Sequence, residues 1–151
     1  MKILLVDDNR YFLESIEKFL MSTGTGIIIV GKAFSGREAI RVSLELKPDL
    51  ILMDLTMPEM GGLEATHVIK TAHNPPRIII LTMYESEEYQ KAAREAGADG
   101  YVSKSDLYQM LMPCMNNFFP DVSMNHSTDP IKSAINTHLR SDDLFNKILK
   151  E

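Results

Sequence analysis

A chain of 151 residues is long enough for one domain with a proper hydrophobic core and too short for two domains of ordinary size. Its net charge of −5 argues against binding of nucleic acid through a broad basic face. The single cysteine excludes an intramolecular disulfide, and the apolar run that opens the chain is too short for a signal peptide or a membrane span. We therefore expect a cytoplasmic protein that does not insert into a membrane.

The first half of the predicted domain alternates two strands with two helices. An apolar run at Ile3–Val6 predicts a strand, and Tyr11–Met21 carries apolar residues along one helical stripe. A second strand is predicted at Ile27–Val30. Ser35 then has the character of an N-cap, and Glu38 stands three residues later, where it would complete a capping box at the start of a second helix.

The second half continues this alternation. Strands are predicted at Leu50–Met53, Ile78–Leu81 and Gly100–Val102, and helices near 63–69 and over Ser86–Ala96. Most of the strand segments are nearly unbroken series of isoleucine, leucine and valine. Such series are typical of strands that are buried on both faces of a parallel sheet.

A fifth helix completes the predicted domain. We expect Ser105 to cap it and Pro113 to kink it or to split it into two short pieces. Five strand–helix pairs with such short connections predict an α/β fold, a right-handed, doubly wound (βα)5 parallel sheet with helices on both faces. In this topology the five strands lie in the order 2-1-3-4-5.

The composition changes after the predicted domain, which covers residues 1–119. Residues 120–130 are polar and show no periodicity, so we expect a linker there. Residues 131–151 regain helical spacing with an apolar stripe. This stripe predicts a helical tail that buries one face against the domain, against another protomer or against a partner.

Five polar residues stand at the ends of the predicted strands. Asp7 and Asp8 follow the first strand, Asp54 ends the third, Thr82 ends the fourth and Lys104 follows the fifth. Ligands of open parallel sheets bind outside the carboxyl ends of the strands, so we expect these side chains to face one crevice. Three carboxylates in one crevice would repel one another unless a cation joined them, and their hard oxygen atoms suit Mg²⁺.

With a metal ion in place, Asp54 could act as a nucleophile toward a phosphoryl group, since aspartyl phosphates are established covalent intermediates. Lys104 could supply an ammonium and Thr82 a hydroxyl to neutralise the developing charge. Each residue taken alone is better explained as the solvated end of a strand or as a helix cap. The combination of all five at one edge of the sheet favours the phosphoryl-transfer site.

The chain resembles bacterial response-regulator receiver domains over residues 1–119, in the segments LLVDDN, DLILMDLTMPEMGGLEA, IIILTMYE and ADGYVSKSD. The resemblance implies that Asp54 is the phosphoacceptor and that Asp7 and Asp8 form the acidic pair around Mg²⁺, for which Mn²⁺ could substitute. It also implies that Asp8 contacts the metal directly and that the backbone carbonyl of Thr56 completes the metal ligands of the protein.

The same resemblance implies a conformational switch. Lys104 would bind the phosphoryl group, Thr82 would move toward it, and the ring of Tyr101 would turn inward behind the threonine. The implied phosphoryl donor is a sensor histidine kinase or a phosphotransfer protein, and a homodimer is a further implied partner. The output would be a change on the face made by the fourth helix, the fifth strand and the fifth helix, with the residues Tyr84, Glu88, Tyr89, Lys91, Tyr101 and Leu107.

The sequence looks most like receivers of the NarL/FixJ (LuxR-type) branch, with three departures. Met83 follows the switch threonine, where many receivers have a small residue, and Ser105 replaces a frequent proline after the lysine, so we expect no cis bond there. The segment after residue 120 is too short for the helix-turn-helix domain of this branch. We therefore expect no direct binding of nucleic acid by this chain unless it is a fragment of a longer regulator.

Two other functions are compatible with the same residues. The first is a phosphohydrolase of the haloacid dehalogenase type, which also uses a nucleophilic aspartate and Mg²⁺ but places it after the first strand. The second is a pseudo-receiver that docks on partners without phosphorylation. The favoured interpretation is a switch module that is not an enzyme, because it would catalyse only its own phosphorylation and dephosphorylation.

Overall fold

The computed structural model describes residues 1–23 and 26–121. The predicted tail at 131–151 and most of the predicted linker lie outside these residues. The strands are β1 (Lys2–Val6), β2 (Ile28–Ala33), β3 (Leu50–Asp54), β4 (Arg77–Thr82) and β5 (Gly100–Ser103). The helices are α1 (Arg10–Thr23), α2 (Gly36–Leu46), α3 (Gly62–Lys70), α4 (Glu87–Glu95), the short 3₁₀ helix η1 (Lys104–Asp106) and α5 (Leu107–Phe118).

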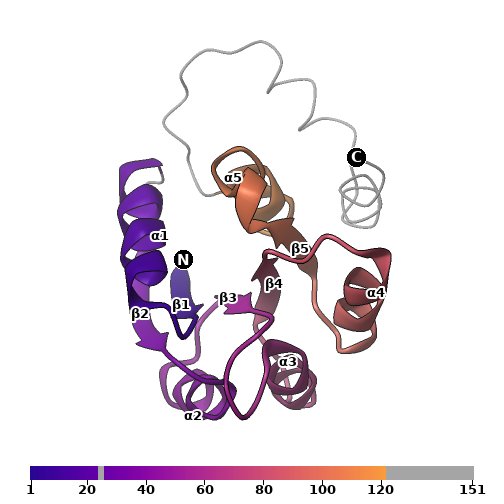
Figure 1. Ribbon diagram of the computed structural model, residues 1–151. Helices are drawn as coiled ribbons and strands as arrows, with labels where there is room; N and C mark the ends of the chain where they lie inside the picture. The colour runs from indigo at the N-terminus through magenta and orange to yellow at the C-terminus, as the bar shows by residue number, and fades with distance from the viewer. Residues whose placement is uncertain (24–25, 122–151) are drawn as a thin grey trace.

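The five strands are parallel and lie in the order β2-β1-β3-β4-β5, which confirms the predicted α/β fold. Helices α1 and α5 cover one face of the sheet, and α2, α3 and α4 cover the other (Figure 1). All five strands therefore point their carboxyl ends toward the same edge of the molecule. No helix of the described part of the chain is long and apolar enough to span a membrane.

Alternate residues of each central strand enter two separate hydrophobic cores. In β3, for example, Leu50 and Leu52 pack beneath α1 and α5, whereas Ile51 and Met53 pack against α2 and α3. Successive side chains of a strand point to opposite faces, so a strand between two helical layers must be apolar at every position. This requirement explains the unbroken apolar runs of the sequence.

Strand β2 extends further along the chain than predicted. The apolar run ends at Val30, but Gly31, Lys32 and Ala33 continue the strand by pairing with β1. As an edge strand, β2 is buried mainly at Ala33, so hydrophobicity marks only part of its length.

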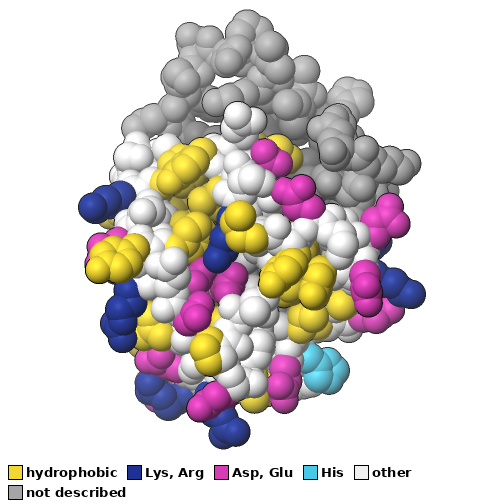
Figure 2. Space-filling model, in the orientation of Figure 1, with side chains coloured by type: hydrophobic (Ala, Val, Ile, Leu, Met, Phe, Trp, Pro, Cys, Tyr) yellow, Lys and Arg dark blue, Asp and Glu magenta, His cyan; other side chains and the backbone are white. Residues whose placement is uncertain are grey.

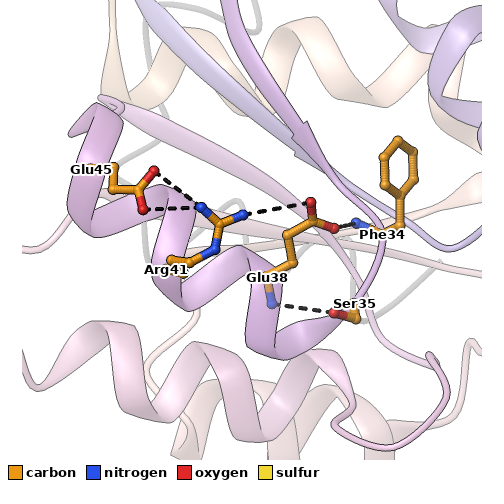
Figure 3. A network of polar contacts seen from close by, with 5 residues as sticks. All are labelled: Phe34, Ser35, Glu38, Arg41 and Glu45. Atoms are coloured by element: carbon orange, nitrogen blue, oxygen red, sulfur yellow. Dashed lines mark hydrogen bonds and ion pairs between the residues drawn. The ribbon is translucent and has the colours of Figure 1, made fainter.

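The predicted capping box at the start of α2 is present in a modified form. The Ser35 hydroxyl accepts a hydrogen bond from the Glu38 backbone N–H at 3.2 Å, as expected for an N-cap (Figure 3). The Glu38 carboxylate accepts from the N–H of Phe34 at 2.8 Å, one residue before the N-cap. Arg41 lies between Glu38 and Glu45 on the exposed side of the same helix.

The start of α5 differs from the prediction. The Ser103 hydroxyl accepts a hydrogen bond from the Ser105 backbone N–H and caps η1, so the expectation that Ser105 caps α5 is wrong. Pro113 does not split the helix, which is continuous over Leu107–Phe118. The apolar face of α5 packs into the core on both sides of the proline, and this packing holds the two halves in one helix. All peptide bonds of the described residues are trans.

Candidate functional site

Three carboxylates meet at the carboxyl ends of β1 and β3. One oxygen atom each of Asp7, Asp8 and Asp54 lies within 4.8 Å of the other two. Asp7 and Asp54 are buried, whereas Asp8 is exposed at the rim. Figure 2 shows acidic side chains gathered beside a basic one near the middle of this face, with hydrophobic side chains on both sides. The predicted clustering of these aspartates is therefore present.

Lys104 brings a positive charge to this cluster from the end of β5. Its Nζ lies 2.6 Å from Asp7 Oδ2 and 3.0 Å from Asp54 Oδ1. The ammonium also lies 4.1 Å from the ring centroid of Phe12, a cation–π contact that sequence reasoning missed. Burial lowers the pKa of Lys104, but the hydrogen bonds to Asp7 and Asp54 outweigh burial and hold the pKa above its ordinary value. The side chain is thus a charged bridge between two buried carboxylates.

The Asp54 carboxyl binds its proton more tightly than an ordinary aspartate does. Burial is the largest cause and, with the neighbouring charge of Asp7, raises its pKa from 3.8 to about 6, although Lys104 opposes the rise. A single ammonium therefore does not fully compensate three acidic groups in one place. A divalent cation with hard oxygen ligands fits the charge and the ligand type of this cluster.

The loop after β3 packs tightly against the site, because α3 begins directly behind it. A Cβ atom at Gly62 would lie 1.9 Å from the Asp54 carbonyl oxygen. The Gly62 N–H donates to the carbonyl of Leu55 at 2.9 Å, which fixes the loop that contains Thr56. Only glycine fits at this position. The GG pair of the sequence was the available signal for this residue, but the pair alone does not say which glycine is required.

We expect Gly62→Ala to lower the free energy of unfolding by about 3 kcal/mol, because the new methyl group forces the backbone at Asp54 to shift. Urea unfolding of the metal-free protein measures this change. Gly61→Ala is the matched control, since its Cβ would lie 3.2 Å from the nearest atom, the Leu55 carbonyl oxygen. Equal losses in the two variants would contradict the assignment of the close contact to Gly62.

The predicted switch residues lie in one hydrogen-bonded network at the end of β4. Thr82 is buried, and its hydroxyl accepts from the Tyr84 N–H at 3.1 Å. The Tyr101 ring is buried as well, and its hydroxyl donates to the Tyr84 carbonyl at 2.6 Å. Burial raises the pKa of Tyr101 to about 12, although a hydrogen bond with the Thr82 side chain lowers it. In this structure the aromatic ring thus lies inward.

The raised pKa of Tyr101 predicts that one of the five tyrosines ionises late. Absorbance of tyrosinate during an alkaline titration should show one phenol that is still protonated at pH 11, and Tyr101→Phe should remove this late component. Since the folded protein binds this proton more tightly than the unfolded chain, stability should fall as the pH rises from about 10 to about 12. A late component that survives in the variant would belong to another tyrosine.

The residues of the predicted output face are not equally exposed. Tyr84 and Tyr89 lie on the surface with ring centroids 4.8 Å apart, and Glu88 and Lys91 are exposed on α4. Leu107 is only 2% exposed, because its side chain enters the core at the start of α5. Its predicted place on this surface is therefore wrong.

Comparison with known proteins agrees with this geometry. A family model described as the response regulator receiver domain matches residues 3–112. Transcriptional regulatory protein YdfI of Bacillus subtilis (strain 168) is 44% identical over 115 residues, covering 76% of this chain and 53% of that protein. Response regulator protein VraR of Staphylococcus saprophyticus is 38% identical over 120 residues, covering 77% of this chain and 57% of that protein. The chain thus spans about half the length of these curated relatives.

A solved structure gives the same result for the fold. The crystal structure of a two-component response regulator of the LuxR family from Aurantimonas sp. SI85-9A1 has a TM-score of 0.70 and 32% sequence identity. The similarity covers 97% of this chain and 94% of that chain.

Proposed function

The chain belongs to the response regulator receiver domain family of two-component systems, and from that premise we propose that Asp54 accepts a phosphoryl group in a Mg²⁺-dependent reaction. Receiver domains act with histidine kinases or phosphotransfer proteins and are not classical enzymes. The single observation that carries the proposal is the contact of the Lys104 ammonium with both buried carboxylates, Asp7 and Asp54.

Each residue of the site has a role in this proposal. Asp7, Asp8, Asp54 and the carbonyl of Thr56 would hold Mg²⁺, or Mn²⁺ in its place. When bound, the ion neutralises charge on the transferred phosphoryl group. A carboxylate oxygen of Asp54 attacks phosphorus, and the bond from phosphorus to the donor nitrogen breaks, so that the imidazole leaves with the electron pair. Lys104 binds a phosphoryl oxygen and replaces its present contact with Asp54.

The switch would begin at Thr82. If its hydroxyl turned toward the phosphoryl group, it would lose the hydrogen bond from Tyr84, whose carbonyl is held by Tyr101. The loop between β4 and α4 would then move, and the exposed residues of α4 would follow. We propose that Tyr84, Glu88, Tyr89 and Lys91 form the output surface.

The partners follow from the same proposal. A sensor histidine kinase or a phosphotransfer protein would supply the phosphoryl group to residues 1–119, and a second copy of the chain is a candidate output partner. Residues 120–130 would link this domain to the segment at 131–151. Direct contact with nucleic acid is not part of the proposed function of this chain.

Turnover assays test the proposal against a phosphohydrolase. We expect the protein to hydrolyse p-nitrophenyl phosphate no faster than its Asp54→Asn variant, because the site phosphorylates only itself. Acetyl phosphate with Mg²⁺ should instead be consumed slowly, and only by the protein with Asp54. Repeated turnover of the phosphate ester that depends on Asp54 would favour the haloacid dehalogenase type of activity and contradict the switch.

A further inference from the structure

Three side-chain oxygen atoms, from Glu85 and from the two chain neighbours of Lys104, meet in one cluster. The Ser103 hydroxyl lies 2.5 Å from Glu85 Oε1, and the Ser105 hydroxyl lies 2.7 Å from the same atom. The two hydroxyls lie 2.6 Å from each other. Glu85 follows β4 in the loop before α4, whereas the serines stand at the end of β5 and in η1. The cluster therefore connects the loop before α4 with the end of β5 and with η1, which lie 18 and 20 residues further along the chain.

The hydrogen atoms available in this cluster favour one arrangement. Two hydroxyls supply two hydrogens for three oxygen–oxygen contacts, and an ionised carboxylate only accepts. Hydrogen bonds to a charged acceptor are the strongest of the three, so both serines donate to Glu85. Two hydrogen bonds hold the pKa of Glu85 below its ordinary value, and the one from Ser103 contributes more than the one from Ser105. The lowered pKa agrees with this arrangement.

The two serines are the immediate neighbours of Lys104 in the chain. The Ser103 hydroxyl also accepts from the Ser105 N–H at 3.3 Å, so it fixes the backbone on both sides of the lysine. Glu85 thereby ties this short segment to the loop after β4. That loop also contains Tyr84, whose N–H donates to the hydroxyl of Thr82, the last residue of β4.

We propose that Glu85 is a positioning residue that acts through Ser103 and Ser105 to hold the Lys104 ammonium against the buried carboxylates of the site. The importance of this placement for phosphoryl transfer rests on the proposed function above. Glu85 itself lies outside the acidic cluster that would hold the metal ion. Its removal should thus alter the placement of Lys104 and leave the metal ligands in place.

The first test observes Lys104 directly in the metal-free protein. Nitrogen-15 NMR of the lysine ammonium groups reports how fast their protons exchange with water, and the signal that disappears in Lys104→Met identifies Lys104. We expect Glu85→Ala to speed this exchange about fivefold, as if the Lys104 ammonium had lost the net strength of one typical hydrogen bond. Glu85→Gln should restore much of the slow exchange, because an amide oxygen still accepts from both serines. Glu87→Ala, at an exposed acidic residue two positions after Glu85 and at the start of α4, is the matched control and should resemble the wild type.

A double variant tests the route of the effect. Ser105→Ala in the Glu85→Ala background should not speed the ammonium exchange further, because the serine hydroxyl then has no Glu85 carboxylate to which it can donate. A fully additive effect would contradict the action of Glu85 through the serine. Unchanged exchange in Glu85→Ala, or an equal change in Glu87→Ala, would overturn the positioning role.

The second test concerns phosphoryl transfer. At saturating Mg²⁺, phosphorylation by acetyl phosphate should be about fivefold slower in Glu85→Ala, whereas the affinity for Mg²⁺ should be unchanged. An equal loss of Mg²⁺ affinity would mean that Glu85 supports the whole site instead of Lys104. If the wild type takes up no phosphoryl group at all, the proposed function fails, and the ammonium exchange still decides whether Glu85 positions Lys104.

Discussion

Replacing Asp54 with asparagine should raise the free energy of unfolding of the metal-free protein at pH 7 by up to about 3 kcal/mol. Burial and the charge of Asp7 make the ionised carboxylate unfavourable in the folded state, which the pKa of about 6 reflects. Asparagine has nearly the same shape and keeps an oxygen that can accept from Lys104, but it carries no charge.

The stability gained from Asp54→Asn should depend on pH. Between pH 3.8 and about 6 the folded protein binds a proton at Asp54 that the unfolded chain has already lost, so wild-type stability falls as the pH rises through this range. The gain from Asp54→Asn should thus be absent near pH 3.5 and complete above pH 6.5. Urea unfolding at the two pH values measures it, with the exposed Asp106→Asn as control.

A gain of equal size at both pH values would contradict the role of the charge at Asp54. Addition of Mg²⁺ gives an independent check. An ion that binds only the folded state stabilises it by about 2.7 kcal/mol at a hundredfold excess over its dissociation constant. Since Asp54→Asn removes one carboxylate ligand, Mg²⁺ should stabilise the wild type much more than the variant.

Lys104→Met is the second change for which we expect a large effect, a loss of about 3 kcal/mol in the unfolding free energy of the metal-free protein. The ammonium lies within 3.0 Å of two buried carboxylates, and methionine fills a similar volume without the charge. Asp7 and Asp54 would then lie close together without the ammonium that now contacts both carboxylates and compensates their charges.

Mg²⁺ should restore most of this loss, because the ion compensates the same carboxylates. Thermal unfolding with and without 10 mM Mg²⁺ measures both effects. Lys18→Met, at an exposed position of α1, is the matched control and should change stability little in either condition. A Lys104→Met protein that is unstable to the same extent with saturating Mg²⁺ would mean that the lysine supports the fold through its packing and not through its charge.

The order of the sheet and the clustering of the aspartates could be predicted because both depend on the pattern of the chain. Unbroken apolar runs mark strands between two helical layers, and parallel strands place their final residues at one edge. Asp7, Asp54 and Lys104 are 47 and 50 residues apart along the chain, but Asp54 is the last residue of a strand and the other two each follow directly on one. Their meeting therefore follows from the topology alone.

The details that could not be predicted depend on contacts between segments. Ser105 has the sequence of a helix cap, but it lies inside η1, a 3₁₀ turn that Ser103 caps by accepting from the Ser105 N–H. The need for glycine at position 62 arises from the Asp54 carbonyl, eight residues earlier. Leu107, by contrast, begins the apolar stripe of α5 that continues at Leu111 and Cys114 and enters the core, so its burial follows from helical spacing and not from the resemblance that places it on the output face.

Uptake of a phosphoryl group at Asp54 can be measured directly as the intact mass of the protein after incubation with acetyl phosphate and Mg²⁺. We expect a gain of one phosphoryl group, about 80 Da, that is absent with EDTA and absent in Asp54→Asn. A wild-type mass that does not change while Mg²⁺ binding is still detectable, or an equal gain in Asp54→Asn, would contradict the assignment of Asp54 as the phosphoacceptor.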